Sequence, residues 1–317
     1  MSSPDVQHVH DVPAPSTLLY AVEGPVARLT LNRPKQGNGI TLDMAREIAE
    51  CVERANLDPA VHVIALSGNG PGFCGGYDLA ASAESLSGYE EGAGGNFQVG
   101  GPLDPAVIAQ NHDPRRVWDP VVDYQMMTRN VRGFMSLFHS EKPVLCKVQG
   151  FCVAGGTDLA LCADLLVVAD DAKIGYPPAR VWGSPTSALW AARLGVAQAK
   201  RLLLTGDCLS GVEAVQWGLA TQTAPPDQLD ESFEALVQRV ARLPISQLVM
   251  QKLLINQALY SQGLYATQVL GTVFDGLARH TSEGYQFQRM SAEAGWREAV
   301  RQRDEPFGDL GSSTYKG

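Results

Sequence analysis

The stretch from Lys147 to Asp164, KVQGFCVAGGTDLALCAD, constrains the fold more than any other part of the chain. The apolar run 144–148 that leads into it is typical of a short buried strand. Gly155 and Gly156 then open a predicted helix at a turn of small residues, where another group can approach the backbone closely. The first N–H groups of a helix have no partner within it, so they can bind an oxygen that carries or develops negative charge. We therefore predict a strand, a tight turn and a helix, with free backbone donors at the turn.

Asp158 falls in the first turn of that predicted helix, three residues after Gly155. A carboxylate beside a cluster of N–H donors is the combination that enolate or oxyanion chemistry requires. The same residues also have a structural interpretation, since glycines permit close packing and Asp is common in a first helical turn. From this stretch alone both interpretations stay open. A phosphate-binding loop is excluded, because Gly156 stands where that loop needs its lysine.

The composition limits the classes of protein to consider. The chain has 317 residues, 45% of them apolar, which is enough for one large core or two modest ones. Its formal charge is −9 and it has no long basic stripe, so we expect no nucleic-acid partner. The six cysteines show no metal-like spacing and are typical of buried thiols in a reducing compartment. With no signal-peptide pattern and no long apolar run, we expect a cytoplasmic protein without a membrane partner or a bound metal.

The chain before the central stretch alternates strands, helices and turns. The runs 18–22 and 26–31 alternate in polarity around Glu23-Gly24-Pro25, which predicts a hairpin. Thr41 can cap a helix with an apolar face, and the run 61–66 predicts a buried strand. That strand leads into a second glycine-rich turn, which ends at Asp78 and could also present backbone N–H groups.

The same alternation of strands and helices repeats around the central stretch and stops near residue 225. A helix around 127–138, the central strand and helix, and a strand over 165–169 follow in order, and Ser210 with Glu213 predicts a capping box. After Pro225-Pro226 every pattern is helical. We therefore divide the chain into a flexible tail (1–15), a core (16–225) and a helical region (226–317), with helices at about 227–242, 246–261, 264–280 and 283–302.

An unusual segment, about 84–125, interrupts the core. It begins rich in glycine and ends dense in polar and aromatic side chains. Long segments of this kind are lids, binding loops or plain surface. Its chemically capable residues are His112, Asp113, Asp119, Asp123 and Tyr124.

The two glycine turns, the repeated rhythm and the helical C-terminal region together resemble the crotonase superfamily, also called the enoyl-CoA hydratase/isomerase family. The matching stretches are 29–34 with Asn38, 72–79, 147–164, 204–206, 213–219 and 299–304. The resemblance covers about 16–305 apart from the 84–125 insertion. It implies an α/β fold, a crotonase-like spiral of ββα turns with a C-terminal α-helical region. It further implies an acyl-CoA substrate, with coenzyme A present only as part of that substrate, and a homotrimer or dimer of trimers.

The resemblance also assigns roles to residues. It implies that the backbone N–H groups of Tyr77 and Gly155 hold the thioester oxygen as it becomes an enolate, and that Asp158 is the acid or base. The CoA portion is expected along the loops near Arg33 and before Phe73. The full set of expected substrate and CoA contacts is Arg33, Lys35, Phe73, Gly75, Gly76 and Gly156.

One departure from the family pattern affects the expected reaction. Hydratases of the family use two glutamates; here the first position is Asp158 and the second falls at Pro178, which carries no acid. Either the insertion supplies the second group, from His112, Asp119, Asp123 or Tyr124, or the reaction needs only one base. We expect hydration or dehydration of an enoyl-CoA. A double-bond isomerase, a hydrolase of a CoA ester or C–C bond, and a non-catalytic acyl-CoA-binding homologue stay open as alternatives.

Overall fold

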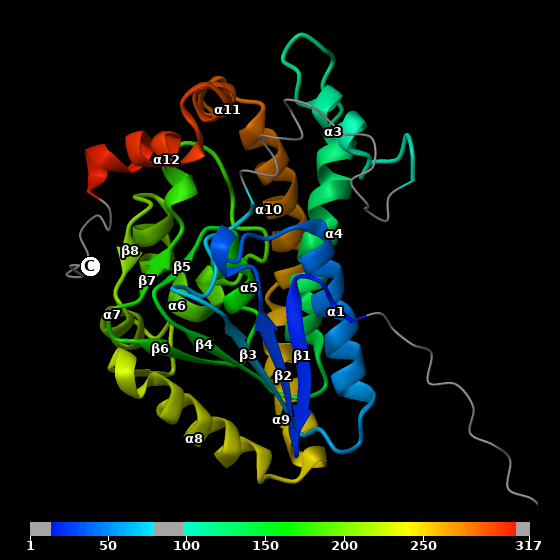
Figure 1. Cartoon of the computed structure of the whole chain (residues 1–317), viewed down its shortest axis with the longest axis vertical. Helices are drawn as coiled ribbons and strands as arrows, with labels where there is room; N and C mark the ends of the chain where they lie inside the picture. The colour runs from blue at the N-terminus through cyan, green and yellow to red at the C-terminus, as the bar shows by residue number, and fades with distance from the viewer. Residues whose placement is uncertain (1–13, 79–97, 309–317) are drawn as a thin grey trace, which may run out of the picture.

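A computed structural model describes residues 14–78 and 98–308 and has a six-stranded main sheet with the order β1-β2-β3-β4-β6-β9 (Figure 1). The strands β1 and β2 form the predicted antiparallel hairpin, and the other neighbours pair in parallel. The mixed α/β class with a helical C-terminal region is confirmed. The strand bounds are Leu18–Glu23, Val26–Leu31, Val63–Gly68, Val144–Val148, Leu165–Ala169 and Gln222–Ala224.

Helices cover the main sheet, which explains the continuous apolar runs of its parallel strands. The helix α1 (Leu42–Leu57) contacts β1 and β2, and α4 (Pro120–His139) packs along α1. The helix α8 (Leu229–Ala241) runs beside β3, β4, β6 and β9, as the lower part of Figure 1 shows. Its buried Leu229, Phe233 and Val237 join the same apolar core as the strands. The first helix after residue 225 therefore belongs to the core.

A second, three-stranded sheet adjoins the turn before Gly155 and was not predicted. It has the order β5-β7-β8, with bounds Phe151–Val153, Lys173–Gly175 and Cys208–Leu209. Strands of two or three residues are too short to show a polarity period, so the sequence pattern could not reveal them. A single bridge between Cys74 and Cys152 connects β5 to the second glycine turn.

The predicted helix ends were confirmed where a local capping interaction fixes them. The Thr41 hydroxyl accepts a hydrogen bond from the Met44 N–H at the start of α1. Ser210 and Glu213 form both bonds of the predicted capping box at the start of α7. The other helices are α3 (Pro105–Asn111), α5 (Gly155–Ala160), α6 (Trp190–Leu203) and α7 (Gly211–Gln216), with 3-10 turns at Pro34–Gln36, Pro177–Arg180, Pro226–Gln228 and Glu305–Phe307.

The predicted single helix over 283–302 was wrong. The chain forms α9 (Ile245–Ser261) and α10 (Leu264–Arg279) as expected, and then two helices, α11 (Ser282–Ala294) and α12 (Trp296–Asp304). Gly295 separates these two with φ 87° and ψ 149°, a conformation that no helical residue adopts. Apolar residues can keep a helical spacing on both sides of a glycine even where the helix breaks there. The spacing alone therefore does not show that a single helix continues.

The cysteines and the tail were also predictions from sequence. All six thiols are free and buried, as expected, and burial raises the pKa of Cys51 to about 11 and of Cys74 to about 12. Residues 1–13 of the predicted tail and the glycine-rich first part of the insertion lie outside the described residues. Among the described helices, none is both long and apolar enough to cross a membrane.

The packing of α4 on α1 generates a test of the fold. A Cβ added at Gly133 would lie 2.3 Å from the Ala45 carbonyl oxygen of α1. Alanine normally stabilises a helix interior by about 1 kcal/mol relative to glycine. Here we expect Gly133→Ala to destabilise by about 1–3 kcal/mol instead, because the two helices must separate. Urea unfolding measures the change. Arg129→Ala, on the exposed face of α4, is the control, and a Gly133→Ala protein as stable as wild type would contradict this packing.

Candidate functional site

The site forms where the two glycine turns pack against each other. Cys74 and β5 exchange backbone bonds of 3.1 Å, from the Cys74 N–H to Phe151 and from the Val153 N–H to Cys74. A Cβ at Gly156 would lie 2.4 Å from the Cys74 carbonyl oxygen, and one at Gly76 would lie 2.8 Å from the Ala154 Cβ. Close packing therefore requires glycine at both positions. Segments about 80 residues apart are thereby held in contact.

This packing leaves two backbone donors side by side. The N–H groups of Tyr77 and Gly155 donate no hydrogen bond to any described residue. A Cβ at Gly76 would lie 3.3 Å from the Gly155 nitrogen, and one at Gly155 would lie 2.8 Å from the Tyr77 ring, so the two residues are adjacent. Ala154 turns the chain at this point with φ 54° and ψ −130°, a strained conformation for a residue with a side chain. That turn takes the Gly155 N–H out of the β5 ladder.

Asp158 lies fully buried in the first turn of α5. Its Oδ1 accepts hydrogen bonds from the Ser187 N–H at 3.0 Å and the Ser187 hydroxyl at 2.9 Å, whereas its Oδ2 has no hydrogen-bond partner in the described ranges 14–78 and 98–308. Burial raises the pKa of this carboxyl to about 7, against the opposing effect of the Ser187 hydrogen bonds. A carboxyl with this pKa can both release and take up a proton near neutral pH.

Further buried polar atoms around Asp158 lack partners. The Tyr77 hydroxyl lies beside Thr186, but neither oxygen has a hydrogen bond of acceptable geometry. Burial and the nearby Asp158 raise the pKa of Tyr77 and of the buried Tyr176 well above the usual range. An unpaired buried polar atom costs about 1–3 kcal/mol. Several of them adjoin Asp158, so this buried region holds polar atoms that a polar ligand group would satisfy.

The position of the family's second glutamate provides no acid in the folded chain. Pro178 lies in the 3-10 turn 177–180, whose carboxyl-terminal Arg180 has a buried side chain. Arg180 forms ion pairs with Asp304 at 3.0 Å and Asp207 at 3.6 Å, so it ties this turn to the end of α12. This turn therefore holds the end of α12 in place and supplies no acid side chain.

A family model described as enoyl-CoA hydratase/isomerase matches residues 21–98 and 121–290. A crystal structure of an enoyl-CoA hydratase from Mycobacterium smegmatis is 52% identical with a TM-score of 0.85, and the match covers 93% of this chain and 96% of that one. The chain belongs to the enoyl-CoA hydratase/isomerase family. The predicted resemblance and the crotonase-like fold are thereby confirmed.

Two named relatives share less of this sequence. The putative enoyl-CoA hydratase EchA13 of Mycobacterium tuberculosis is 30% identical over 232 residues, which are 70% of this chain and 67% of that protein. The carnitinyl-CoA dehydratase of Proteus mirabilis is 28% identical over 229 residues, 71% of this chain and 74% of that protein. Their names differ in reaction, so similarity at this level indicates the family and not the chemistry.

Residues 99–120, which the enoyl-CoA hydratase/isomerase model leaves unmatched, lie within the predicted insertion. They contain α3 and the approach to α4. Asp119 caps α4 by accepting a hydrogen bond from the Val121 N–H. Tyr124 lines a cavity of about 100 Å³ between α4 and α10, together with Thr128, Val131, Arg132, Met135, Tyr265, Gln268, Val269 and Thr272. Neither Asp119 nor Tyr124 contacts Asp158 in the described part of the chain.

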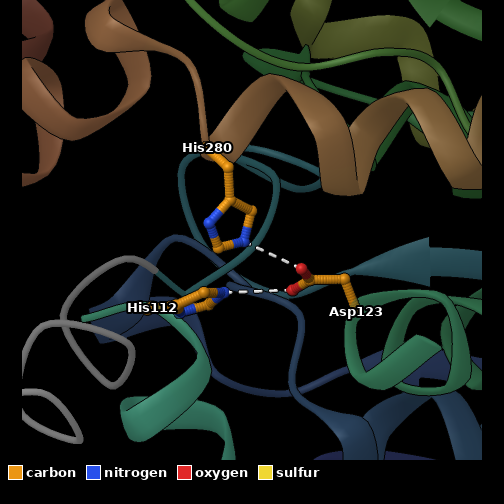
Figure 2. A group of neighbouring side chains, drawn as sticks. All are labelled: His112, Asp123 and His280. Carbon is orange, nitrogen blue, oxygen red and sulfur yellow. Dashed lines mark hydrogen bonds and ion pairs between the residues drawn. The ribbon is translucent and has the colours of Figure 1, made fainter. Parts of the chain in front are cut away.

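The other two candidates of the insertion, His112 and Asp123, meet His280 from the end of α10 (Figure 2). Both imidazoles direct Nε2 at the Asp123 carboxylate, at 3.1 Å from His112 and 2.8 Å from His280. Trp118 Nε1 donates to the same carboxylate at 2.6 Å and Asn111 Nδ2 at 3.2 Å. We call these five residues the Asp123 clasp, because they attach the insertion to the C-terminal helices.

The side chains of the Asp123 clasp lie close enough together to hold a metal ion, but their hydrogen bonds are those of donors arranged around a carboxylate. The ligand atoms of His112, Asp123 and His280 lie within 4.8 Å of one another. Burial acts to raise the pKa of Asp123, but hydrogen bonds from His112, His280 and Trp118 outweigh it and hold that pKa well below its usual range. A cation would have to replace both imidazole contacts and would lie near Arg279, whose guanidinium is 3.9 Å from Asp123. The geometry favours a hydrogen-bonded clasp over a metal centre.

The residues expected to contact CoA occupy diverse environments. Arg33 donates to Asp78 at 2.7 Å and so connects the loop after β2 to the end of the second glycine turn, whereas Lys35 is exposed. Phe73 is fully buried in the core, and the Gly75 N–H donates to the Gly37 carbonyl at 2.9 Å. Their contacts with CoA stay predictions. Sequence reasoning missed Ser187, which holds Asp158, because no motif marks a serine that acts from 29 residues away.

The buried Asp158 generates a prediction for stability. Its pKa rises from 3.8 to about 7 on folding, so the folded state keeps a proton that the unfolded chain releases between these values. This stabilising contribution is complete below about pH 4 and is lost as the pH rises through about 7. The full difference is about 4 kcal/mol. We expect Asp158→Asn to be more stable than wild type at pH 8, by about 1–4 kcal/mol, with a smaller difference at pH 5.

Urea unfolding of both proteins at pH 5 and pH 8 measures this difference. Asp43→Asn, which removes a half-exposed carboxyl from α1, is the control for a general charge effect. A stability difference between wild type and Asp158→Asn that is the same at both pH values would show that Asp158 does not titrate in the expected range.

Proposed function

We propose that this chain is an enzyme that acts on an acyl-CoA thioester through an enolate held by the N–H groups of Tyr77 and Gly155. The observation that carries the proposal is the pairing of these two unused donors with the buried carboxyl of Asp158. Donors of this kind each contribute roughly 3–4 kcal/mol to an oxyanion transition state. Membership of the enoyl-CoA hydratase/isomerase family supports the substrate class.

Asp158 is proposed to move the proton at Cα. Its pKa of about 7 suits a group that must accept a proton in one step and return it in the next. When the thioester oxygen lies on the two N–H groups, negative charge that leaves Cα is delocalised onto that oxygen. The Cα proton and the enolate are then bound by neighbouring residues, Asp158 and Gly155 of α5 and Tyr77 of the second glycine turn.

For the overall reaction we propose hydration or dehydration of an enoyl-CoA. The names of the Mycobacterium smegmatis and Proteus mirabilis relatives, a hydratase and a dehydratase, support it. A double-bond isomerase is the second candidate, because it needs one base and the turn at Pro178 supplies no second acid. Hydrolysis of a CoA ester or C–C bond, and binding without catalysis, are the outcomes to distinguish from both.

The test separates Cα chemistry from water addition. Wild type and Asp158→Asn are incubated with butyryl-CoA in D₂O, and loss of the α-proton signal is followed by NMR. We expect exchange by wild type, with a rate that rises with pH through about 7 as Asp158 ionises, and a 10²–10⁴-fold lower rate for Asp158→Asn. Hydration of crotonyl-CoA and one longer enoyl-CoA is followed by loss of enone absorbance. Equal background exchange by both proteins, with CoA esters still bound, would indicate a non-catalytic homologue.

The predicted trimer or pair of trimers is also a proposal. The helices α9 and α10 expose a set of large apolar side chains, which a partner copy could cover. They are Met250, Leu253, Leu254, Ile255, Leu270, Val273, Phe274 and Leu277.

Light scattering is expected to give three or six times the mass of one chain, and Leu254→Glu to lower that mass. Leu57→Glu, at an equally exposed leucine at the end of α1, is the control. A monomer mass for wild type would overturn the proposal.

A further inference from the structure

The loop 184–187 holds two buried carboxylates. At its end, Ser187 donates two hydrogen bonds to Asp158, as described above. At its start, the Ser184 N–H faces Asp275 Oδ1 of α10 at 3.5 Å. Both carboxylate residues are buried, with 0% of Asp158 and 4% of Asp275 exposed. One four-residue loop thus connects a carboxylate of the core to a carboxylate of the C-terminal helices.

The helix α10 lies closely along this loop. Gln268 Nε2 donates to the Ser187 carbonyl at 2.9 Å. A Cβ at Gly271 would lie 2.7 Å from the Pro185 carbonyl oxygen, so the absence of a side chain allows the approach. Asp275 comes one helical turn after Gly271 and therefore lies on the same face of α10. The close contacts between α10 and the loop 184–187 therefore fix the position of Asp275.

The two carboxylates border the same group of unpaired polar atoms. The hydroxyls of Tyr77 and Tyr176 are each affected by the charges of both Asp158 and Asp275. Asp158 Oδ2, the Tyr77 hydroxyl and Thr186 Oγ1 are all buried without a partner. Tyr77 also supplies one of the two free backbone donors, so this group adjoins the position proposed for the thioester. The loop 184–187 carries Thr186 of this group and contacts one carboxylate at each end.

The two oxygens of Asp275 have different environments. Oδ2 is bound by the Arg279 guanidinium at 2.5 Å. Among the described residues, Oδ1 has only the long contact with the Ser184 N–H, which leaves it able to accept a further hydrogen bond. Arg279 itself is buried and contacts Asp123 of the clasp at 3.9 Å. The charge of Asp275 is therefore compensated at Oδ2, while Oδ1 can accept a further hydrogen bond.

We propose that Asp275 is the second acid–base carboxylate of this site and replaces, from α10, the acid missing at Pro178. This inference rests on the proposed acyl-CoA chemistry. In hydration, the water oxygen forms a bond to Cβ as Asp275 takes one proton from it. The π electrons move to the thioester oxygen, which the N–H groups of Tyr77 and Gly155 hold. Protonated Asp158 then gives its proton to Cα, and the proton on Asp275 returns to Asp158 through solvent. The net change is addition of one water.

The experiment compares two rates in wild type, Asp275→Asn and Asp123→Asn. The first rate is α-proton exchange of butyryl-CoA in D₂O, which of the two carboxylates needs only Asp158. The second rate is hydration of crotonyl-CoA, which needs both. We expect Asp275→Asn to keep exchange within about threefold of wild type and to lose hydration by 10²–10⁴-fold. Asp123→Asn is the matched control, because it removes another buried carboxylate beside Arg279, one whose hydrogen bonds among the described residues go to the clasp and not to the loop 184–187. Its ratio of hydration to exchange is expected to stay within about threefold of wild type.

Each other outcome has a distinct meaning. If Asp275→Asn lowers both rates equally, Asp275 only holds the loop, and the inference is overturned; unchanged rates overturn it as well. A wild type that exchanges α-protons without hydrating any enoyl-CoA overturns it while leaving the enolate proposal intact. A wild type that binds CoA esters without exchange defeats the proposed function itself. If Asp275→Asn does not fold, the double variant Asp275→Asn/Arg279→Gln removes the unpaired guanidinium and gives the same comparison.

Discussion

The close contact between the two glycine turns is the constraint on which the rest of the site depends. Gly156 lies against the Cys74 carbonyl, and Gly76 lies against Ala154. Any side chain at these points would separate the turns and, with them, the N–H groups of Tyr77 and Gly155. The strained backbone of Ala154 has the same consequence, since it turns one of those N–H groups away from the strand ladder. The structure confirms the packing interpretation of these glycines, and the proposed chemistry would require the same small residues.

The burial of Asp158 illustrates how the site trades stability for reactivity. Removing this carboxyl from water raises its pKa to about 7, which is unfavourable for the ionised form and useful for a group that exchanges protons. Ser187 compensates only one of the two carboxylate oxygens. The uncompensated oxygen and the neighbouring unpaired hydroxyls keep the region polar inside an apolar core. Hydrogen bonds from a polar ligand would satisfy these atoms and remove the free-energy cost of burying them without partners.

The C-terminal helices contribute more than a cover for the core. The helix α10 touches the loop that holds Asp158, brings Asp275 to the start of that loop, and ends at His280 in the Asp123 clasp. Arg279 lies between Asp275 and Asp123 and so connects the insertion to the site through buried charges. The clasp accounts for three of the polar and aromatic side chains of the insertion: His112 and Trp118 bind Asp123, which also binds His280. Asp119 instead caps α4, and none of these described side chains is hydrogen-bonded to Asp158.

The sequence by itself determined the features that depend on neighbours along the chain. The hairpin, the caps at Thr41 and Ser210, the strand over residues 165–169, the start of α5 at Gly155 and the family follow from local patterns and motifs. Only the tertiary structure decided the second sheet, the break at Gly295 and the surroundings of Asp158. Its partner Ser187 is 29 residues away, and Asp275 lies 91 residues from Ser184. Periodicity and capping report on one or two turns of chain, whereas contacts across such separations depend on how closely helices and loops pack.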